Sequence, residues 1–381
     1  MINFLSISLF FLTLFFCIGT YVLYPIFLFL FGAIKSIKIH KKDITPSVSI
    51  IISAFNEDKD IEQKIKNTLA LDYPKDKVEI LIGSDGSTDD TTEIMERYTD
   101  FGIVSFNFKE NRGKTSVQND LVSAAKNEIL IFTDAASFLP ENSVRKIVRN
   151  FNDDRVGCVA GKMRFIDTDQ NITTKSQGIY WKYEVKVRSL ESLIGSLIGV
   201  DGPLYAIKKE YYVPLEPNII SDLMSPLLVL GMGKKAVLES EAFVDELPKQ
   251  ESKAEFDTRR RITLRGLVGI FSHPHLLNPK KHLLLSLQIV FHKVIRWSVG
   301  PLSLLNLMSC MILSDGNSWF LLIVILYALF FFAALVGWIK KDIKSKFITI
   351  PYYFCLVNFA ATMAIFDFFM KKQAVTWKTV R

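Results

Sequence analysis

The sequence predicts an α/β domain with a mostly parallel central sheet, flanked by transmembrane helices on its N-terminal and C-terminal sides. One observation is composition: 30 of the 381 residues are Phe and the mean hydropathy is +0.24, which is too apolar for a wholly soluble protein. The other is the middle of the chain, where apolar runs of strand length alternate with amphipathic segments of helix length. This alternation is typical of parallel sheets covered by helices on both faces.

Residues 1–34 form the first predicted element, a transmembrane helix. No charged residue occurs between positions 2 and 34, and this length exceeds the roughly 20 apolar residues that cross a bilayer. A cleavable signal peptide fits poorly, because no cationic segment precedes the run and no small-residue cleavage site follows it. Lys35, Lys38, Lys41 and Lys42 come next. Such a basic flank predicts that the following domain is cytoplasmic.

The domain at residues 43–266 alternates regularly in its first half. We expect strands at 47–55, 78–84, 103–108 and 128–135, and helices at 58–71, 89–98, 114–125 and 141–151. In sheets of this kind, ligands bind beyond the carboxyl ends of the strands. Loops that follow the strands are therefore where functional side chains are expected.

Polar side chains do follow these strands. Asn56 and Glu57 come after the first strand, Asp85 after the second and Asp134 after the fourth. We expect all of them at one edge of the sheet, where they would contact a ligand. The acidic pair at 89–90 is expected to cap the next helix instead.

Three further apolar stretches, 283–313, 319–339 and 347–370, end the chain. Charged residues interrupt the beginning of the first stretch. We therefore predict interfacial helices at 267–297, transmembrane helices at 298–370 and a basic tail at 371–381. The basic segments 340–346 and 371–381 flank one apolar run, so either that run is re-entrant or one segment breaks the positive-inside rule.

Charge and cysteine content exclude some classes of protein. The net charge of +7 needs no nucleic acid, since much of the basic excess lies beside apolar segments. The four cysteines show no metal-ligand spacing and no disulfide framework. We expect the histidines (His273, His275, His282 and His292) at the surface, and Asp367 near enough to the end of its run to reach the interface.

Several motifs together resemble the membrane-bound family 2 glycosyltransferases, which have the GT-A fold and include cellulose, hyaluronan and poly-N-acetylglucosamine synthases. They are "SIIISAFNE", "LIGSDGSTDDT", "NRGKTSVQND", "IFTDAAS", "DGPLYAIKKE" and "FDTRRRITLRG". Each motif alone is weak, but in this order they cover nearly all of the domain at 43–266. The flanking membrane segments match as well.

The resemblance implies transfer of a sugar from a nucleotide-activated donor, UDP-linked by analogy. It implies that Asn56, Glu57 and Asp85 contact the base and ribose and that Lys114 lies near the nucleotide. A solvent-exposed lysine is the alternative interpretation of Lys114.

Asp134 matches the first acid of the family's D-x-D motif, which implies a Mg²⁺ or Mn²⁺ ion. The third position is Ala136, which cannot bind a metal. Asp134 would then bind the ion with the diphosphate and water, and Ser137 is a weak additional candidate.

Asp222 aligns with the family's general base, which takes the proton of the acceptor hydroxyl. Ser221 replaces the acid that usually precedes it. The alternative is that Asp222 only caps a helix that ends at glycine.

Arg259, Arg260 and Arg261, followed by Arg265, resemble an arginine-rich form of the Q-x-x-R-W element, which pairs with the diphosphate. Attraction to lipid headgroups is the alternative. No Trp follows the motif directly, which counts against a cellulose-type synthase.

Acceptor contacts are assigned to Trp181 and Gly202. An aromatic strip at helical spacing is more often part of a protein core, which is the alternative for Trp181. Gly202 would permit close approach of the backbone.

These expectations combine into one function: an inverting glycosyltransferase of the inner (cytoplasmic) membrane, with its catalytic domain in the cytoplasm. Its acceptor would be lipid-linked or a growing glycan, in cell-surface polysaccharide or glycolipid synthesis. A homodimer or export machinery are candidate partners. The alternatives are a processive synthase with its own channel, a non-catalytic scaffold, which Ala136 and Ser221 favour, and a transporter, which we disfavour.

Overall fold

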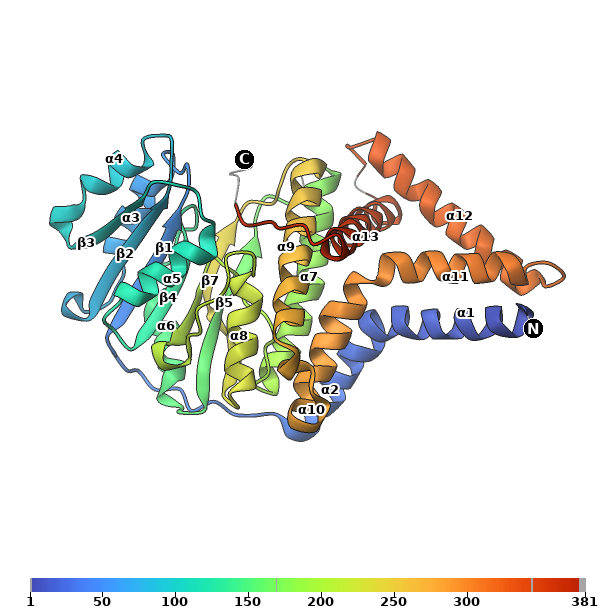
Figure 1. Ribbon diagram of the computed structural model, residues 1–381, viewed down its shortest axis with the longest axis horizontal. Helices are drawn as coiled ribbons and strands as arrows, with labels where there is room; N and C mark the ends of the chain where they lie inside the picture. Colours follow the sequence, from blue (N-terminus) through green and yellow to red (C-terminus); the bar gives the residue numbers. More distant parts are fainter. Residues whose placement is uncertain (1, 169, 344, 377–381) are drawn as a thin grey trace.

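The computed structural model describes residues 2–168, 170–343 and 345–376. The predicted basic tail at 371–381 therefore lies outside the described residues from position 377 onward. An α/β domain occupies one end of an elongated molecule and apolar helices occupy the other, with long helices between them (Figure 1). The predicted fold class is confirmed.

The sheet has seven strands in the order β3-β2-β1-β4-β6-β5-β7. They are β1 (Val48–Ala54), β2 (Val78–Asp85), β3 (Ile103–Phe108), β4 (Ile129–Asp134), β5 (Val156–Phe165), β6 (Tyr205–Lys208) and β7 (Lys235–Glu246). Strand β1 pairs in parallel with β2 and β4, β2 with β3, and β5 with β7. Only β6 runs antiparallel to its neighbours β4 and β5. The sheet is thus mostly parallel, as predicted.

Alternation along the buried strands divides the core into two layers. Ile51 packs with Phe132 and Leu121 on one face, whereas Ile50 and Ile52 pack on the other. Because side chains alternate across a strand, a run that is apolar at every position must be covered on both sides. The strands therefore required helices on both faces, and the structure supplies them.

The helices of this domain are α3 (Ile61–Leu69), α4 (Thr91–Glu96), α5 (Lys114–Ala124), α6 (Ser143–Val148) and α8 (Ser221–Gly231). Five 3₁₀ turns accompany the α-helices of the described chain: η2 (Lys75–Lys77), η3 (Thr99–Phe101), η4 (Arg149–Asn152), η5 (Lys209–Tyr211) and η6 (Pro274–Leu277). The helices predicted at 58–71, 89–98 and 141–151 are shorter at both ends than expected. Turns and 3₁₀ segments fill the difference.

Two long helices, α7 (Ile172–Leu193) and α9 (Ser252–Ser272), stand between the sheet and the apolar helices (Figure 1). A capping box starts α7: the Asn171 side chain accepts a hydrogen bond from the Thr174 amide at 3.0 Å, and Thr174 Oγ1 accepts one from the Asn171 amide at 3.1 Å. Helix α9 runs unbroken through the boundary predicted between residues 266 and 267.

The N-terminal apolar run is one bent helix. It consists of α1 (Ile2–Ile18), the π-helical turn η1 (Gly19–Leu23) and α2 (Tyr24–Lys35). A second bent run consists of α10 (Pro279–Ile289), the π-helical turn η7 (Val290–Ile295) and α11 (Val299–Leu313), with 68° between its halves. The two π-helical turns meet, since Thr20 Oγ1 donates to the Phe291 carbonyl at 2.6 Å. Helices kink at such turns.

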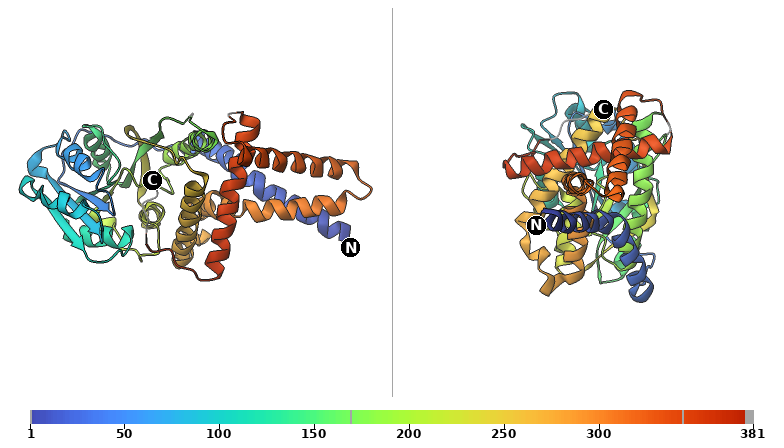
Figure 2. Two further views of the ribbon diagram at one scale, coloured as in Figure 1. Left: turned by 90° about the horizontal axis from the view of Figure 1, so that it is seen from above. Right: turned by 90° about the vertical axis from the view of Figure 1, so that its right-hand side faces the viewer.

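Helix α12 (Ser318–Ile339) packs with α11, and α13 (Lys346–Phe369) lies across the direction of α1, α11 and α12 (Figure 2). By length and composition, the described helices Asn3–Lys35, α12 and α13 could each cross a membrane, as could the bent α10–α11 pair. Helix α13 is continuous rather than re-entrant.

Helix α13 lies along α9 for most of its length. Tyr352 donates to Ser252 at 2.6 Å near one end, and the Asp367 carboxylate lies 2.5 Å from Arg260 near the other. Lys372 is 3.0 Å from the same carboxylate. Asp367 is 3% exposed, so the expectation that it reaches the interface by itself is wrong. Two cations hold it inside the protein.

Candidate active site

Loops after β1 and β2 are tied together at the carboxyl edge of the sheet. Asn56 has a φ of 52°, in the left-handed region that few non-glycine residues adopt. Its side-chain oxygen accepts a hydrogen bond from the Thr88 amide at 2.8 Å, and the Glu57 amide donates to Thr91 at 2.7 Å. The two residues predicted to contact a nucleotide thus lie beside the second loop, as expected for a shared edge. Asp89 bonds Thr91 at 2.6 Å.

Asp85 ends β2 and is fully buried. Its carboxylate accepts hydrogen bonds from the Arg112 amide at 2.9 Å and the Gly113 amide at 2.8 Å. Gly113 has a φ of 89°, which suits glycine, and precedes the first residue of α5. In the geometry shown, Asp85 fixes the start of α5 and hence the position of Lys114. Direct contact of Asp85 with a ligand stays a prediction.

Lys114, Asp134 and Asp222 come together at this edge, and we call them the lysine–aspartate cluster. Lys114 Nζ lies 2.6 Å from Asp134 Oδ1 and 3.9 Å from Asp222 Oδ1. Although burial lowers the pKa of Lys114, the two carboxylates raise it above its ordinary value. Burial raises the pKa of Asp222, and the Lys114 ammonium offsets part of that rise. The cluster joins three residues that are far apart in the sequence.

Gly202 packs directly against the cluster. A Cβ atom at this position would lie 2.8 Å from Lys114 Nζ, 2.9 Å from Asp222 Oδ2 and 3.1 Å from Asp134 Oδ2. The loop is held by Arg188, which contacts both oxygens of Asp201 at 2.6 Å. A side chain at position 202 would therefore displace the charged groups of the cluster.

The arginines predicted to act together point in different directions. Arg259 pairs with Glu255 at 2.7 Å, and Arg260 pairs with Asp367. Arg261 has neither a carboxylate within 4.0 Å nor a hydrogen bond among the described residues. Burial lowers its pKa, while Asp222 and Asp134 attract its charge. Of the three adjacent arginines, Arg261 is the one the structure directs toward the cluster.

Arg265 has a supporting position. It donates to Thr115 at 2.8 Å and to the Ile219 carbonyl at 2.7 Å, which joins α5 to the chain just before α8. Burial lowers its pKa to about 10, and Arg261 adds to this effect. Arg265 therefore holds the helix that carries Asp222 against the helix that carries Lys114.

A cavity of about 340 Å³ lies beside the cluster, and we call it the inner cavity. Gly202, Asp222 and Trp181 line it. The Trp181 indole nitrogen donates to the Met163 carbonyl at 2.8 Å, which fixes the ring in the cavity wall. Trp181 and Gly202, both predicted as acceptor contacts, thus border one cavity within the size range of ligand sites, roughly 300–1,000 Å³.

A second set of buried groups supports the turn that follows Asp134. Lys64 donates to Thr133 at 2.8 Å and to the Ser137 carbonyl, and Ser137 donates to Glu246. Burial lowers the pKa of Lys64 to about 7 and raises that of Glu246 to about 7. The sequence analysis missed both residues, because Lys64 sits in an amphipathic helix and Glu246 belongs to no motif. Ser137, a candidate metal ligand, is engaged by Glu246 instead.

The set of oxygen donors suits a divalent cation only when a phosphate ligand is added. Among the described residues, no group of three or more His, Cys, Asp or Glu side chains is placed to hold a metal. Mg²⁺ commonly uses one or two carboxylates together with substrate phosphates and water. Asp134 fits that pattern, with Asp222 beside it.

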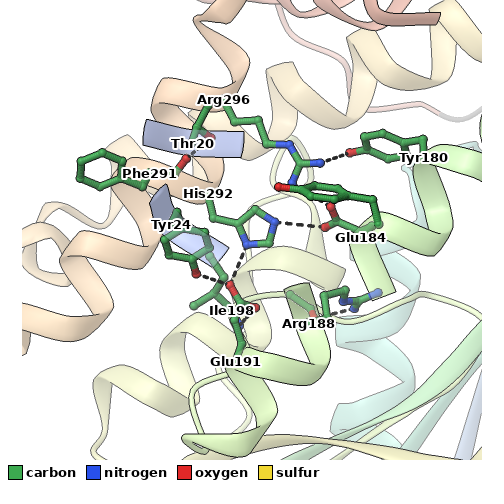
Figure 3. A network of polar contacts seen from close by, with 12 residues as sticks. Thr20, Tyr24, Tyr180, Glu184, Arg188, Glu191, Ile198, Phe291, His292 and Arg296 are labelled. Atoms are coloured by element: carbon green, nitrogen blue, oxygen red, sulfur yellow. Dashed lines mark hydrogen bonds and ion pairs between the residues drawn. The ribbon is translucent and has the colours of Figure 1, made fainter. Parts of the chain in front are cut away.

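A polar network joins the inner cavity to the membrane helices (Figure 3). His292 contacts Glu191 at 2.7 Å and Glu184 at 3.2 Å, and Arg296 donates to Glu184 at 2.8 Å. His292 is 2% exposed, so its predicted surface position is wrong. Tyr24 of α2 donates to Glu191 at 2.5 Å.

Comparisons with known proteins agree with this architecture. Residues 49–210 match the family described as "Glycosyl transferase family 2". The poly-beta-1,6-N-acetyl-D-glucosamine synthase of Staphylococcus aureus is 26% identical over 208 residues, which is 50% of this chain and 50% of that protein. The probable glycosyltransferase YdaM of Bacillus subtilis is 29% identical over 156 residues, covering 36% and 37% of the two chains. The chain spans about half the length of the first of these relatives and less of the second.

A solved structure extends the likeness to the membrane helices. The mannosyltransferase PcManGT from Pyrobaculum calidifontis, in complex with GDP-Man and Mn²⁺, superimposes with a TM-score of 0.74 at 20% identity. The alignment covers 98% of this chain and 100% of that one. This likeness confirms the predicted GT-A fold with its flanking helices.

Proposed function

We propose that this chain, whose residues 49–210 match glycosyl transferase family 2, is an inverting glycosyltransferase that uses a nucleotide-sugar donor. The observation that carries the proposal is the lysine–aspartate cluster at the carboxyl edge of a parallel sheet, with Lys114 Nζ 2.6 Å from Asp134 and 3.9 Å from Asp222. A cation and two carboxylates border one cavity there. This is the set of charges that sugar transfer from a diphosphate requires.

In the proposed reaction, Asp222 is the general base. The acceptor hydroxyl gives its proton to the Asp222 carboxylate as its oxygen attacks the anomeric carbon. Burial raises the pKa of Asp222, which makes the carboxylate a better proton acceptor than an exposed aspartate. One displacement without a covalent intermediate inverts the configuration at the anomeric carbon.

Negative charge develops on the diphosphate as the sugar leaves, and cationic side chains stabilise it. Lys114 and Arg261 are placed for this role. Lys114 is part of the cluster, and Arg261 lies near it and has no carboxylate within 4.0 Å among the described residues. Arginine forks bind phosphate oxygens in pairs. Arg259, which is paired with Glu255 in the same helix, donates to Tyr353 of α13 at 3.1 Å, and Arg260 is paired with Asp367 of α13. Both arginines thus join α9 to α13.

A divalent cation, Mg²⁺ or Mn²⁺, would be held by Asp134 and would neutralise part of the diphosphate charge. The Mn²⁺ named for the mannosyltransferase supports this assignment. Because Ala136 supplies no ligand, the phosphates of the donor would complete the site. A UDP-linked donor is proposed, and GDP-linked sugars are the alternative that the same mannosyltransferase suggests.

We place the catalytic domain at the cytoplasmic face of the membrane, with α1, α11 and α12 as crossings. The basic flank after residue 34 supports this side. Helix α13 lies across these three helices and along α9, which fits a position in the membrane plane. Both basic segments that flank α13 would then be cytoplasmic, which satisfies the positive-inside rule.

Release of nucleoside diphosphate from a panel of nucleotide sugars tests the proposal, with Mg²⁺, Mn²⁺ or EDTA and membrane extract as the source of acceptor. We expect release from one donor, dependent on metal. Asp222→Asn should lower the rate by about 10²–10⁴-fold, the range for loss of a general base, while retaining donor binding. Asp72→Asn, at an exposed carboxylate paired with Arg145, is the matched control. Donor binding without release by the unchanged protein would indicate a non-catalytic scaffold.

A processive synthase is the second candidate function. The name of the Staphylococcus aureus relative, a poly-beta-1,6-N-acetyl-D-glucosamine synthase, favours it. The length of the product formed on a defined acceptor distinguishes one added sugar from a polymer.

A further inference from the structure

An apolar groove of about 250 Å³ lies between η1, α7 and α13. Aromatic and aliphatic side chains line most of it, among them Tyr21, Ile179, Tyr183, Phe354 and Val357.

The groove lies at the level where the apolar helices change direction. Tyr21 belongs to η1, the π-helical turn between α1 and α2. Helix α1 has 17 residues, or about 25 Å at 1.5 Å per residue, which is close to the ~30 Å hydrocarbon core of a bilayer. Thr20 bonds Phe291 of η7, the turn next to the 68° bend before α11. In the proposed topology, both bends therefore lie at the membrane boundary, and the groove lies beside them.

The groove adjoins the inner cavity through a smaller cavity of about 70 Å³, which we call the junction cavity. Tyr180 lines the groove, the junction cavity and the inner cavity. Tyr21 and Val357 line both the groove and the junction cavity, and Lys293 lines both the junction cavity and the inner cavity. Three neighbouring spaces thus run from the membrane boundary to Asp222.

Cations dominate the polar groups of the junction cavity, and only one of them lacks a partner. Arg296 is paired with Glu184 at 2.8 Å and Arg259 with Glu255 at 2.7 Å. Lys293 has neither a carboxylate within 4.0 Å nor a hydrogen bond among the described residues. Its ammonium lies 3.7 Å from where a Cβ of Gly199 would be, on the loop that leads to Gly202.

An unpaired ammonium away from bulk water is costly unless an anion neutralises it. Glu184 and Glu191 attract the charge of Lys293 only from beyond 4.0 Å, whereas each neighbouring arginine has a carboxylate in direct contact. This difference indicates that the anion comes from a ligand. The ligand must be apolar on one side of this anion, where the groove lies, and polar on the other, where the inner cavity lies.

Resting on the proposed function, we propose that the acceptor is a lipid-linked sugar, with its hydrocarbon chain in the apolar groove, its phosphate at Lys293 and its sugar hydroxyl at Asp222. The hydroxyl oxygen bonds to the anomeric carbon of the donor. The bond from that carbon to the diphosphate breaks, its electron pair leaves with the nucleoside diphosphate, and the hydroxyl proton passes to Asp222. The lipid phosphate is unchanged.

Filling the groove tests the position of the hydrocarbon chain. The protein in lipid nanodiscs receives a sugar-radiolabelled donor with either a lipid extract of host membranes or a water-soluble glycan extract. Val357→Trp should lower the label recovered in organic solvent at least tenfold, and Ile179→Trp, on the opposite wall, should do the same. Leu329→Trp, at a residue 59% exposed on α12, is the control and should stay within twofold. Nucleoside diphosphate binding, measured alongside, shows that each variant is folded.

Substituting Lys293 tests the anion. Lys293→Ala should raise the KM for the lipid extract at least tenfold without changing the KM for the donor, and Lys293→Arg should restore most of the loss. Label in water-soluble glycan, with Val357→Trp as active as Leu329→Trp, would overturn the inference while leaving the glycosyltransferase intact. Absence of nucleoside diphosphate release with both extracts would refute the glycosyltransferase itself, and the inference with it.

Discussion

Replacing Gly202 with alanine should disable the active site while leaving the fold intact. The new Cβ would lie 2.8 Å from Lys114 Nζ, 2.9 Å from Asp222 Oδ2 and 3.1 Å from Asp134 Oδ2. Each distance is well inside ordinary van der Waals contact, so the loop or the charged groups must move by several tenths of an ångström. The φ of Gly202 lies outside the left-handed region, so alanine adds no backbone strain there.

The size of the effect follows from geometry. A displacement approaching 1 Å in a reacting site costs about 100-fold in rate, which is ~2.7 kcal/mol of activation free energy. We therefore expect kcat/KM for nucleoside diphosphate release to fall about 100-fold in Gly202→Ala. The melting temperature should change little, because the methyl group faces a cavity rather than the core.

Gly32→Ala on α2 is the matched control. Its Cβ would lie 3.8 Å from Ile194 and 3.9 Å from Leu193, which are ordinary contacts. Activity of this variant should stay within about twofold of the unchanged protein, since alanine is also the better helix former. Full activity in Gly202→Ala would show that the close approach of this loop to the cluster has no part in the reaction.

Three further predictions concern charge and topology. Because burial raises the pKa of Asp222, the plot of kcat/KM against pH should fall toward acid at a pH above the ordinary aspartate pKa, as the carboxylate takes up a proton. The residual activity of Asp222→Asn should not show this acidic fall. Arg296→Ala removes the arginine paired with buried Glu184 and should lower the free energy of unfolding by about 3–5 kcal/mol in a thermal or denaturant melt. Arg145→Ala, at an exposed ion pair, should barely change the melting temperature. Equal shifts in melting temperature for the two variants would contradict the structural role of the network. With the four native cysteines replaced, Ser314→Cys should react with an impermeant maleimide in right-side-out vesicles, and Gln373→Cys, which follows α13, only in inside-out ones. Outside labelling at 373 would mean that α13 crosses the membrane.

Sequence patterns were sufficient for the first four strands of the sheet because their signals are local. Strand β3 has the predicted bounds, β2 differs by one residue at one end, and β1 and β4 differ by one residue at each end. The positions of Asp134 and Asn56 followed from the rule that parallel strands end at one edge. Lys114 was found through the resemblance of its NRGK motif to the family, although its bond to Asp134 joins residues that no pattern connects.

The arginine group could not be resolved from sequence, for a geometric reason. Successive residues of an α-helix point about 100° apart, so Arg259, Arg260 and Arg261 cannot all face one ligand. Which of the three faces the cluster depends on how α9 packs against α7 and α13. Arg260 is directed to Asp367, a residue 107 positions later in the chain.

Buried ion pairs across long sequence separations defeated the remaining predictions. His292 was placed at the surface because a charged residue beside an apolar run is usually solvated. Its partners, Glu184 and Glu191, are 108 and 101 residues earlier. Only packing of η7 against α7 shows that these charges neutralise one another. The same holds for Asp367.

The network of Figure 3 also determines where this protein can be divided. Glu184 and Glu191 belong to a helix of the α/β part, but Arg296, His292 and Tyr24, their partners, come from helices that continue into the membrane. A soluble fragment cut at both membrane borders would keep two carboxylates in its interior and lose the groups that neutralise them. Anchor and catalytic domain are thus one folding unit, and enzymology on this protein needs the whole chain.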